Sequence, residues 1–308
     1  MSSYVLYGAG AVGAVIGGRL HLAGHDVTLV ARGEHLARIR ADGLTLDTAE
    51  GRHVVRAPAT DTAADVDWRA DTVVVLAVKS HQTEAALTDL VAHAPPHTPV
   101  VCAQNGISNE PATLRRFAHT YAVTVMLPAQ HLEPGLVVQV CHPVPGILDI
   151  GRYPSGTDEV AETVAADLRS AGFESAPRPD IMAWKYRKLV TNAVGDVSAV
   201  LPDDADELKP QVRAEAEAVL AAAGVDVVSQ ETDLQRRGDL LRPRPDVRGP
   251  NSLGQSLARG IDTEVDFRAG EVVLLGRLHG VPTPANERVQ RAAHALARND
   301  ADPSPETF

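Results

Sequence analysis

YVLYGAGAVGAVIGGRLHLAGHDVTLVARG, residues 4–33, carries the strongest structural signal in the chain. Tyr4–Tyr7 predicts a short buried strand, and Asp26–Val30 predicts a second one. Between them, residues 12–23 have the pattern of a helix, which Gly24-His25 would end. The order of strand, glycine-rich turn, helix and strand is typical of an α/β domain with parallel strands.

The turn after the first strand has the pattern G-x-G-x-x-G, filled by Gly8, Ala9, Gly10, Ala11, Val12 and Gly13. The first glycine permits the tight turn, the second lets a pyrophosphate approach the backbone, and the third lets helix and strand pack closely. The N–H groups at the helix N-terminus then point at the phosphates. The alternative is a chance cluster of glycines, but the flanking elements favour the dinucleotide-binding turn of a Rossmann-type domain.

Arg32 follows the second strand, at the position that decides which dinucleotide binds. An acidic residue there accepts a hydrogen bond from the ribose 2′-hydroxyl of NAD, whereas an arginine can bind the 2′-phosphate of NADP. The sequence therefore predicts NADP(H) as the cofactor. The alternative is an arginine in a solvated loop.

Further apolar runs have the character of parallel strands covered on both faces, at Thr72–Val78, Val100–Ala103 and Tyr121–Met126. Shorter pieces complete this half of the chain, with strands near 136–140, 147–150 and 173–176 and a helix at 158–171. We expect a doubly wound Rossmann-type sheet, with residues 1–178 as the NADP-binding domain.

The pattern changes after Pro177 and Pro179, where strand signals become rare. Alanine-rich stretches predict helices at 181–197, 206–223 and 285–298. We therefore expect an all-helical, substrate-binding and catalytic domain over residues 179–308. Within it, the proline-rich segment 242–250 is expected to be a loop between helices.

Lys79 and Asn105 each follow an apolar strand, at the edge of an open α/β sheet where ligands bind. Both could contact a bound nucleotide at that edge. Each could equally cap a strand or a helix, and position alone does not separate the two.

The predicted helix 181–197 has one apolar side and one polar side, the polar side comprising Lys185, Lys188, Asn192 and Asp196. Lys188 and Asn192 are four residues apart and so lie one above the other. From the helical pattern alone, a solvated polar stripe is the simpler interpretation.

Composition narrows the possible partners. With 308 residues, two domains are the default expectation, and a formal net charge of -11 disfavours nucleic acid. Two distant cysteines, Cys102 and Cys141, argue against a disulfide framework, and no ligand pattern predicts a metal. We find no leader and no apolar run long enough for a membrane helix, so a cytoplasmic protein is expected. The alanine-rich helices could form a homodimer interface or pack within one chain.

Over nearly its full length the chain resembles the ketopantoate reductase (2-dehydropantoate 2-reductase) family. The matching pieces, in family order, are Gly8–Gly13, Val30–Gly33, Val78-Lys79, Gln104–Gly106, Trp184 with Lys188-Leu189 and Asn192, and Ser252 with Thr263–Asp266. The glycine motif is shared by many dehydrogenases, whereas the spacing of lysine, asparagine, serine and glutamate in the second half is specific. The resemblance implies an NADP-dependent oxidoreductase of pantothenate biosynthesis, which reduces 2-dehydropantoate, a small 2-oxo acid, to pantoate.

The resemblance also implies roles for individual residues. Lys188 would be the catalytic acid, and Glu264 would orient it and contact the cofactor. Asn105, Asn192 and Ser252 would bind the substrate or its carbonyl. An ammonium group held against the carbonyl oxygen both stabilises the growing negative charge and donates the proton.

Asp196 is also expected to face the substrate, but it departs from the family pattern, which usually has Asn-Pro where this chain has Asp196-Val197. A negative charge on the substrate-binding side would weaken the binding of a carboxylate substrate unless a cation such as Lys185 or Arg187 compensates. Two alternatives therefore stay open. One is a related NADP-dependent reductase acting on another carbonyl or an imine, and the other is a non-catalytic NADPH sensor.

Overall fold

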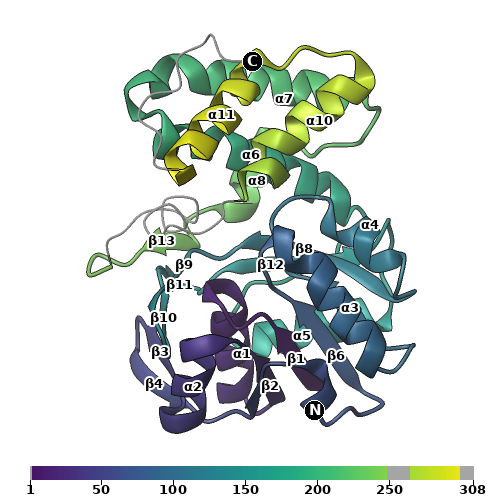
Figure 1. Cartoon of the computed structure of the whole chain (residues 1–308), viewed down its shortest axis with the longest axis vertical. Helices are drawn as coiled ribbons and strands as arrows, with labels where there is room; N and C mark the ends of the chain where they lie inside the picture. The colour runs from purple at the N-terminus through teal and green to yellow at the C-terminus, as the bar shows by residue number, and fades with distance from the viewer. Residues whose placement is uncertain (1, 248–263, 299–308) are drawn as a thin grey trace. The chain divides into compact units, whose positions relative to one another are not determined.

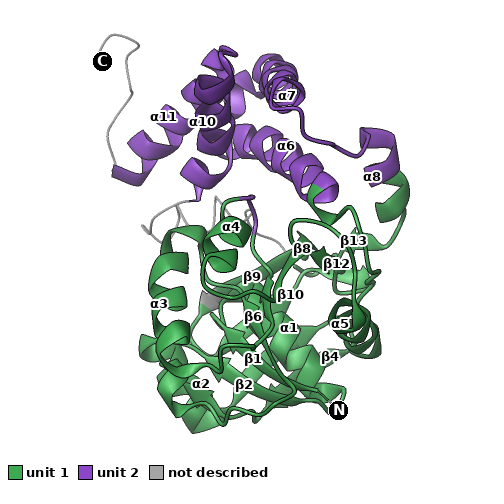
Figure 2. Cartoon of the chain, turned by 90° about the vertical axis from the view of Figure 1, so that its right-hand side faces the viewer, with its two compact units in different colours: residues 1–104, 108–182, 234–247 green, residues 105–107, 183–233, 248–308 purple. Residues whose placement is uncertain are grey.

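The computed structural model describes residues 2–247 and 264–298, and the chain divides into two compact units. The first comprises residues 1–104, 108–182 and 234–247, and the second comprises residues 105–107, 183–233 and 248–308 (Figure 2). The first unit is built on a Rossmann-type sheet and the second from helices, which confirms the predicted fold class.

A seven-stranded sheet forms the core of the first unit (Figure 1). In spatial order its strands are β12 (Ile147–Arg152), β8 (Thr120–Met126), β7 (Val100–Cys102), β6 (Thr72–Leu76), β1 (Ser3–Tyr7), β2 (Asp26–Val30) and β5 (Ala59–Thr60). All neighbours pair in parallel except β12, which runs antiparallel to β8. The strand order reverses between β1 and β6, and dinucleotides bind at such a switch point.

Helices cover both faces of this sheet. Tyr4 and Leu6 of β1 belong to the apolar core shared with α1 (Ala11–Leu22), α2 (Gly33–Asp42) and α5 (Glu159–Ser170). Val5 and Tyr7 belong to the core shared with α3 (Thr83–His93) on the other face, while α4 (Asn109–Leu114) follows β7. Since successive residues of a strand point to opposite faces, the continuous apolar run of β1 is explained by burial on both.

Helix α1 is buried between two sheets. A small second sheet has the order β4 (Gly51–Val55), β3 (Leu44–Thr48), β10 (Leu136–Gln139) and β9 (Ala129–Glu133). A Cβ at Gly17 would lie 2.8 Å from Leu6 and Leu29 of the large sheet, and one at Gly18 would lie 3.1 Å from Leu46 of the small sheet. The predicted strand at 136–140 thus exists, but in the small sheet rather than the large one, because it covers the side of α1 that the large sheet leaves open.

The chain returns to the first unit within α8 (Gln230–Arg237), at residue 234. Arg236 bonds both carboxylate oxygens of the buried Asp149 on β12, at 2.9 and 2.8 Å. Strand β13 (Leu241–Pro243) then pairs antiparallel with β11 (Cys141–Pro143). The expectation that 242–250 is a loop between helices of the second domain is therefore wrong for its described part, residues 242–247.

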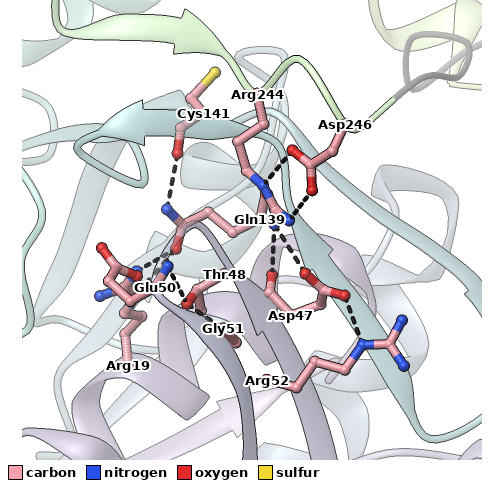
Figure 3. Close-up of polar contacts among 10 residues, drawn as sticks. All are labelled: Arg19, Asp47, Thr48, Glu50, Gly51, Arg52, Gln139, Cys141, Arg244 and Asp246. Atoms are coloured by element: carbon pink, nitrogen blue, oxygen red, sulfur yellow. Dashed lines mark hydrogen bonds and ion pairs between the residues drawn. The ribbon is translucent and has the colours of Figure 1, made fainter.

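Arg244 fixes this returning segment onto the first unit (Figure 3). Its guanidinium lies 2.9 Å from the Asp47 carboxylate, 3.0 Å from the Gln139 carbonyl oxygen and 2.6 Å from the Asp246 carboxylate. The arginine side chain is only 7% exposed, so it needs these acceptors to offset the loss of water. Asp47 lies on β3 and Gln139 on β10, so these two acceptors explain why the segment packs against the small sheet.

The second unit is helical. Its described helices are α6 (Ile181–Val200), α7 (Ala205–Ala222), the first half of α8, α10 (Ala269–His279) and α11 (Pro284–Arg298), with the short 3₁₀ helix η4 (Val265–Phe267). Val197 of α6, Val212 of α7, Ala269 of α10 and Val289 of α11 lie in one core. The sequence predicted α6, α7 and α11 but neither α8 nor α10. In residues 2–247 and 264–298, no helix is both long and apolar enough to cross a membrane.

Candidate active site

The glycine-rich turn is fixed from one side by β2. The N–H groups of Gly8 and Ala9 donate to the Val30 carbonyl oxygen, at 3.1 and 2.8 Å. Helix α1 begins at Ala11, and its N-cap Gly10 provides no side-chain cap. The N–H groups of the first turn have no acceptor within a helix, so this end of α1 suits an anionic group.

The three glycines of the turn meet different surroundings, which tests whether a dinucleotide fits. A Cβ at Gly8 would lie 2.6 Å from the Val78 backbone, and one at Gly13 would lie 2.2 Å from the Gly8 carbonyl oxygen. These two positions need glycine because protein backbone approaches them. A Cβ at Gly10 would meet no atom within 4 Å, so the space there is open to a pyrophosphate. The turn therefore fits a dinucleotide.

Arg32 lies at the N-cap of α2, with an exposed side chain. The Tyr7 hydroxyl, at the end of β1, donates to the Asp89 carboxylate at 2.6 Å. Burial and the Asp89 carboxylate raise the pKa of Tyr7, and the nearby Arg32 guanidinium opposes this rise. Arg32 thus lies at the carboxyl end of β1 and β2, at the edge of the sheet where the glycine-rich turn also lies.

Lys79 is half-buried and is the N-cap of the 3₁₀ helix η2 (Ser80–Gln82), in the segment that follows β6. The Gln104 side-chain amide donates to the Val78 carbonyl oxygen and to the Thr83 hydroxyl, both at 2.9 Å. These bonds join the segments that follow β6 and β7. They hold Lys79 at the carboxyl edge of the sheet, as its position after a strand predicts.

Asn105 lies in the second unit, next to Asn192 of α6. The Asn192 side chain donates to the Asn105 side-chain oxygen at 3.1 Å. Gly106 has φ +80°, and a Cβ there would lie 2.9 Å from the carbonyl oxygen of Phe267 in η4. Glycine therefore lets the Asn105 segment approach the backbone that follows Glu264.

Asp196 forms a buried ion pair with Arg268, at 2.7 Å between Oδ1 and Nη1. A second guanidinium nitrogen of Arg268 lies 3.7 Å from the Glu264 carboxylate. Burial raises the pKa of the Asp196 carboxyl above its ordinary value, and the charges of Arg268 and Lys188 oppose only part of that rise. The pKa of Arg268 is raised, because the two carboxylates outweigh its burial. Two cations and two carboxylates are thus close together, and their formal charges balance.

The polar side of α6 is not a solvated stripe. Lys185 is 3% exposed and Asp196 is 1% exposed. The cation that compensates Asp196 is Arg268, whereas Arg187 bonds the Glu217 carboxylate and the Val228 carbonyl oxygen, both at 2.7 Å. The expectation that Arg187 could balance Asp196 is therefore wrong.

Sequence reasoning did not identify Arg268. The residue follows Phe267 at the start of an apolar segment, where a lone arginine is an available signal for a buried charge pair. Ser252, the remaining predicted substrate-binding residue, lies outside the described residues. The structure thus brings Lys188, Asn192, Asp196, Glu264 and Asn105 into one unit, and holds the glycine-rich turn, Arg32 and Lys79 in the other.

Comparisons with known proteins cover nearly all of the chain. The sequence models of two domains, "Ketopantoate reductase PanE/ApbA" and "Ketopantoate reductase PanE/ApbA C terminal", match residues 4–155 and 180–297. The 2-dehydropantoate 2-reductase of Pyrococcus horikoshii is 29% identical over 301 residues, covering 93% of this chain and 94% of the relative. That of Halobacterium salinarum is 32% identical over 294 residues, covering 91% and 94%. The solved structure of a PanE/ApbA family ketopantoate reductase from Ralstonia eutropha JMP134 is 26% identical, with a TM-score of 0.82 and coverage of 97% and 99%.

Proposed function

Because the chain belongs to the ketopantoate reductase PanE/ApbA family of oxidoreductases, we propose that it uses NADPH to reduce a small 2-oxo acid, with 2-dehydropantoate as the leading candidate. The observation that supports this most directly is the grouping of Lys188, Asn192, Asn105 and Glu264 in one compact unit. A protein that only binds a nucleotide needs neither Lys188 nor Asn192.

Lys188 is the proton donor in this proposal. When bound at the glycine-rich turn, NADPH supplies the hydride that the carbonyl carbon accepts. The Lys188 ammonium group is placed against the carbonyl oxygen, where it stabilises the developing negative charge and gives up its proton. Lys188 lies on α6, whose later turns pack on α7, α10 and α11 through the shared core.

Neutral hydrogen bonds hold the substrate in this proposal. Asn192 and Asn105 already bond one another at 3.1 Å, so each is oriented before a substrate arrives. Side chains that are oriented in advance lose less entropy when they bind. We assign the same type of contact to Ser252.

The buried ion pair bears on which substrate is suitable. An unpaired Asp196 carboxylate would repel the carboxylate of a 2-oxo acid and would favour a substrate that carries an amine. Arg268 lies 2.7 Å from that carboxylate, so most of the negative charge is neutralised locally. The departure from the family pattern at residue 196 therefore does not argue against an oxo acid.

Arg32 is assigned to the 2′-phosphate of NADPH. Its guanidinium lies beside the Tyr7 hydroxyl, at the edge of the sheet that carries the glycine-rich turn. An exposed arginine at this edge can form charge-assisted hydrogen bonds to a phosphate, whereas NADH offers only a hydroxyl there. Lys79 lies in the same unit as the glycine-rich turn, and we assign it to the same cofactor.

The test is an NADPH oxidation assay with the full chain. 2-Dehydropantoate, other 2-oxo acids, simple ketones and imines are supplied in turn, with NADPH and with NADH. The proposal predicts oxidation with at least one 2-oxo acid and faster reaction with NADPH at low nucleotide concentration. Oxidation only with ketones or imines would identify a different reductase, and tight NADPH binding without any oxidation would identify a nucleotide-binding sensor.

A further inference from the structure

We infer that His35 is a positioning residue for the nucleotide cofactor, because it fixes the orientation of the Ala9–Gly10 peptide in the glycine-rich turn. The inference rests on the proposed nucleotide site, but not on any substrate. His35 lies on α2 and is 9% exposed. Neither the G-x-G-x-x-G motif nor the proposed mechanism includes it.

Both ring nitrogens of His35 bond backbone groups. Nε2 lies 2.7 Å from the Ala9 carbonyl oxygen, and the Gly135 N–H donates to Nδ1 at 2.8 Å. A backbone N–H can only donate, so Nδ1 must be the unprotonated nitrogen. Nε2 therefore carries the hydrogen and donates it to Ala9. These two bonds define a single neutral tautomer.

The bond to Ala9 determines where the next N–H points. The peptide unit is planar and trans, so the Ala9 carbonyl and the Gly10 N–H point in opposite directions. The Ala9 N–H is already bonded to the Val30 carbonyl oxygen at 2.8 Å. With its carbonyl held by His35 as well, the residue has little freedom to rotate. The Gly10 N–H is thus aimed away from His35, and Gly10 borders the open space described above.

The small sheet holds His35 in place. Gly135, in the turn between β9 and β10, has φ +82°, a conformation that favours glycine. Its carbonyl accepts from the Thr45 N–H at 2.8 Å, and a Cβ there would lie 2.9 Å from Arg38 of α2. The His131 ring also packs on the His35 ring, with centroids 4.1 Å apart. The small sheet therefore supports the cofactor turn through His35 in addition to covering α1.

Loss of the His35 bond is therefore expected to weaken nucleotide binding but not to abolish it. Without the Nε2 bond, the Ala9–Gly10 peptide can rotate, and binding a pyrophosphate must then fix it again. Loss of one neutral hydrogen bond of this kind corresponds to a roughly three- to tenfold weaker Kd. Turnover at saturating NADPH is expected to change little, because His35 contacts no group assigned to the chemistry.

Three variants of the full chain test this inference. His35→Leu removes both hydrogen bonds. His35→Gln keeps both, because its side-chain oxygen can accept from Gly135 and its NH₂ group can donate to Ala9. His25→Leu is the matched control, since His25 is equally buried at 9% and bonds Ser170 at 3.1 Å, on a different part of the same unit.

The Kd for NADPH is measured directly by titration, together with the KM for NADPH and kcat where turnover is detected. We expect His35→Leu to raise Kd and KM by about three- to tenfold, with kcat kept, and His35→Gln to restore Kd to within about twofold. His25→Leu is expected to lower the melting temperature without a change in Kd. Should His35→Leu not fold, His35→Asn replaces it, because asparagine is too short to reach both partners.

Unchanged Kd in the variant that lacks both bonds would overturn the inference, as would an equal rise in Kd for His25→Leu. The readout also separates this inference from the proposed function. If the chain binds NADPH but reduces no substrate, a weaker Kd in His35→Leu still supports the role of His35. If the wild-type chain binds no dinucleotide, both the proposed function and this inference fail.

Discussion

The Arg268 guanidinium lies 2.7 Å from the Asp196 carboxylate, and the two side chains are 6% and 2% exposed. They come from α6 and from the residue before α10, 72 positions apart in the sequence. A buried arginine needs a carboxylate, and a buried carboxylate needs a cation. The two residues therefore stabilise each other, and the effect of substituting one depends on whether the other is present.

Substituting one member of this pair should destabilise the protein more than substituting both. Asp196→Asn and Arg268→Met are each expected to lower the free energy of unfolding by about 3–5 kcal/mol, whereas the double variant should recover most of that loss. Urea unfolding of the wild type, both single variants and the double variant measures this cycle. The exposed pair of Arg288 and Asp204 is the control and should contribute about 1 kcal/mol or less. Additive losses in the double variant would show that the two side chains do not depend on each other.

Lys188→Ala should lower kcat by at least about two decades, because general acid catalysis typically contributes a hundredfold or more. The Kd for NADPH should stay near the wild-type value. Lys188→Arg keeps the positive charge but releases its proton poorly, so it separates charge stabilisation from proton transfer. The change Lys209→Ala on α7 is the control. Turnover of Lys188→Ala near the wild-type level would exclude this residue as the proton donor.

Arg32→Ala should reduce the preference for NADPH. Hydrogen bonds to charged groups contribute about 1.5–3 kcal/mol, so we expect NADPH affinity to fall by about ten- to a hundredfold while NADH affinity changes little. Parallel titrations with both nucleotides measure the ratio. Arg38→Ala removes another exposed arginine of α2, one that pairs with Asp42 at 3.5 Å, and should leave the ratio unchanged. An undiminished preference in Arg32→Ala would refute the assignment.

Gly10→Ala and Gly13→Ala should have opposite signatures. A Cβ at residue 13 would lie 2.2 Å from the Gly8 carbonyl oxygen, so Gly13→Ala should lower the melting temperature strongly. A Cβ at residue 10 meets no atom within 4 Å, and φ there is -77°, so Gly10→Ala should fold normally. It should nevertheless bind NADPH at least about tenfold more weakly, because its methyl group occupies the space assigned to the pyrophosphate. Thermal unfolding and NADPH titration of both variants give the comparison, and normal NADPH affinity in Gly10→Ala would contradict that assignment.

Asp89→Asn should change how stability depends on pH. Burial alone would raise the pKa of Asp89, but bonds from the Tyr7 hydroxyl, the Ala63 N–H and the Thr62 hydroxyl hold it below its ordinary value. A carboxyl with a lowered folded-state pKa stabilises the fold above its unfolded pKa of about 3.9, and this contribution is lost as the pH falls through the folded value. We expect Asp89→Asn to be about 1 kcal/mol less stable at pH 7 and nearly equal to wild type at pH 3. Denaturant unfolding at both pH values measures the difference, and an equal deficit at pH 3 would mean that the carboxylate charge is not responsible.

Local patterns account for the parts of the fold that could be predicted. Strand β1, the glycine-rich turn and strand β2 follow one another within 30 residues. Apolar runs predict the two strands, and the glycines predict the turn between them. Helices α6, α7 and α11 have apolar faces that a helical wheel detects. Helices α8 and α10 were not predicted.

The small sheet could not be predicted in the same way. Its strand β3 pairs with β10, and these strands are about 90 residues apart in the chain. Nothing local indicates that the sequence near residue 136 leaves the large sheet to cover α1. The same holds for β13, whose place depends on the acceptors that Arg244 finds on β3 and β10.

The sequence alone determined that a glycine-rich turn between two parallel strands precedes a helical half, and that Lys188 and Asn192 share one side of a helix, because each of these signals lies within a short segment. Only the tertiary structure decided that Asp196 is neutralised by Arg268, and that His35 connects Ala9 with Gly135, which lies 100 residues after His35. The physical reason is the same in both cases. A buried charge or ring nitrogen must find a partner, and the partner it finds depends on which distant segments the packed core brings together.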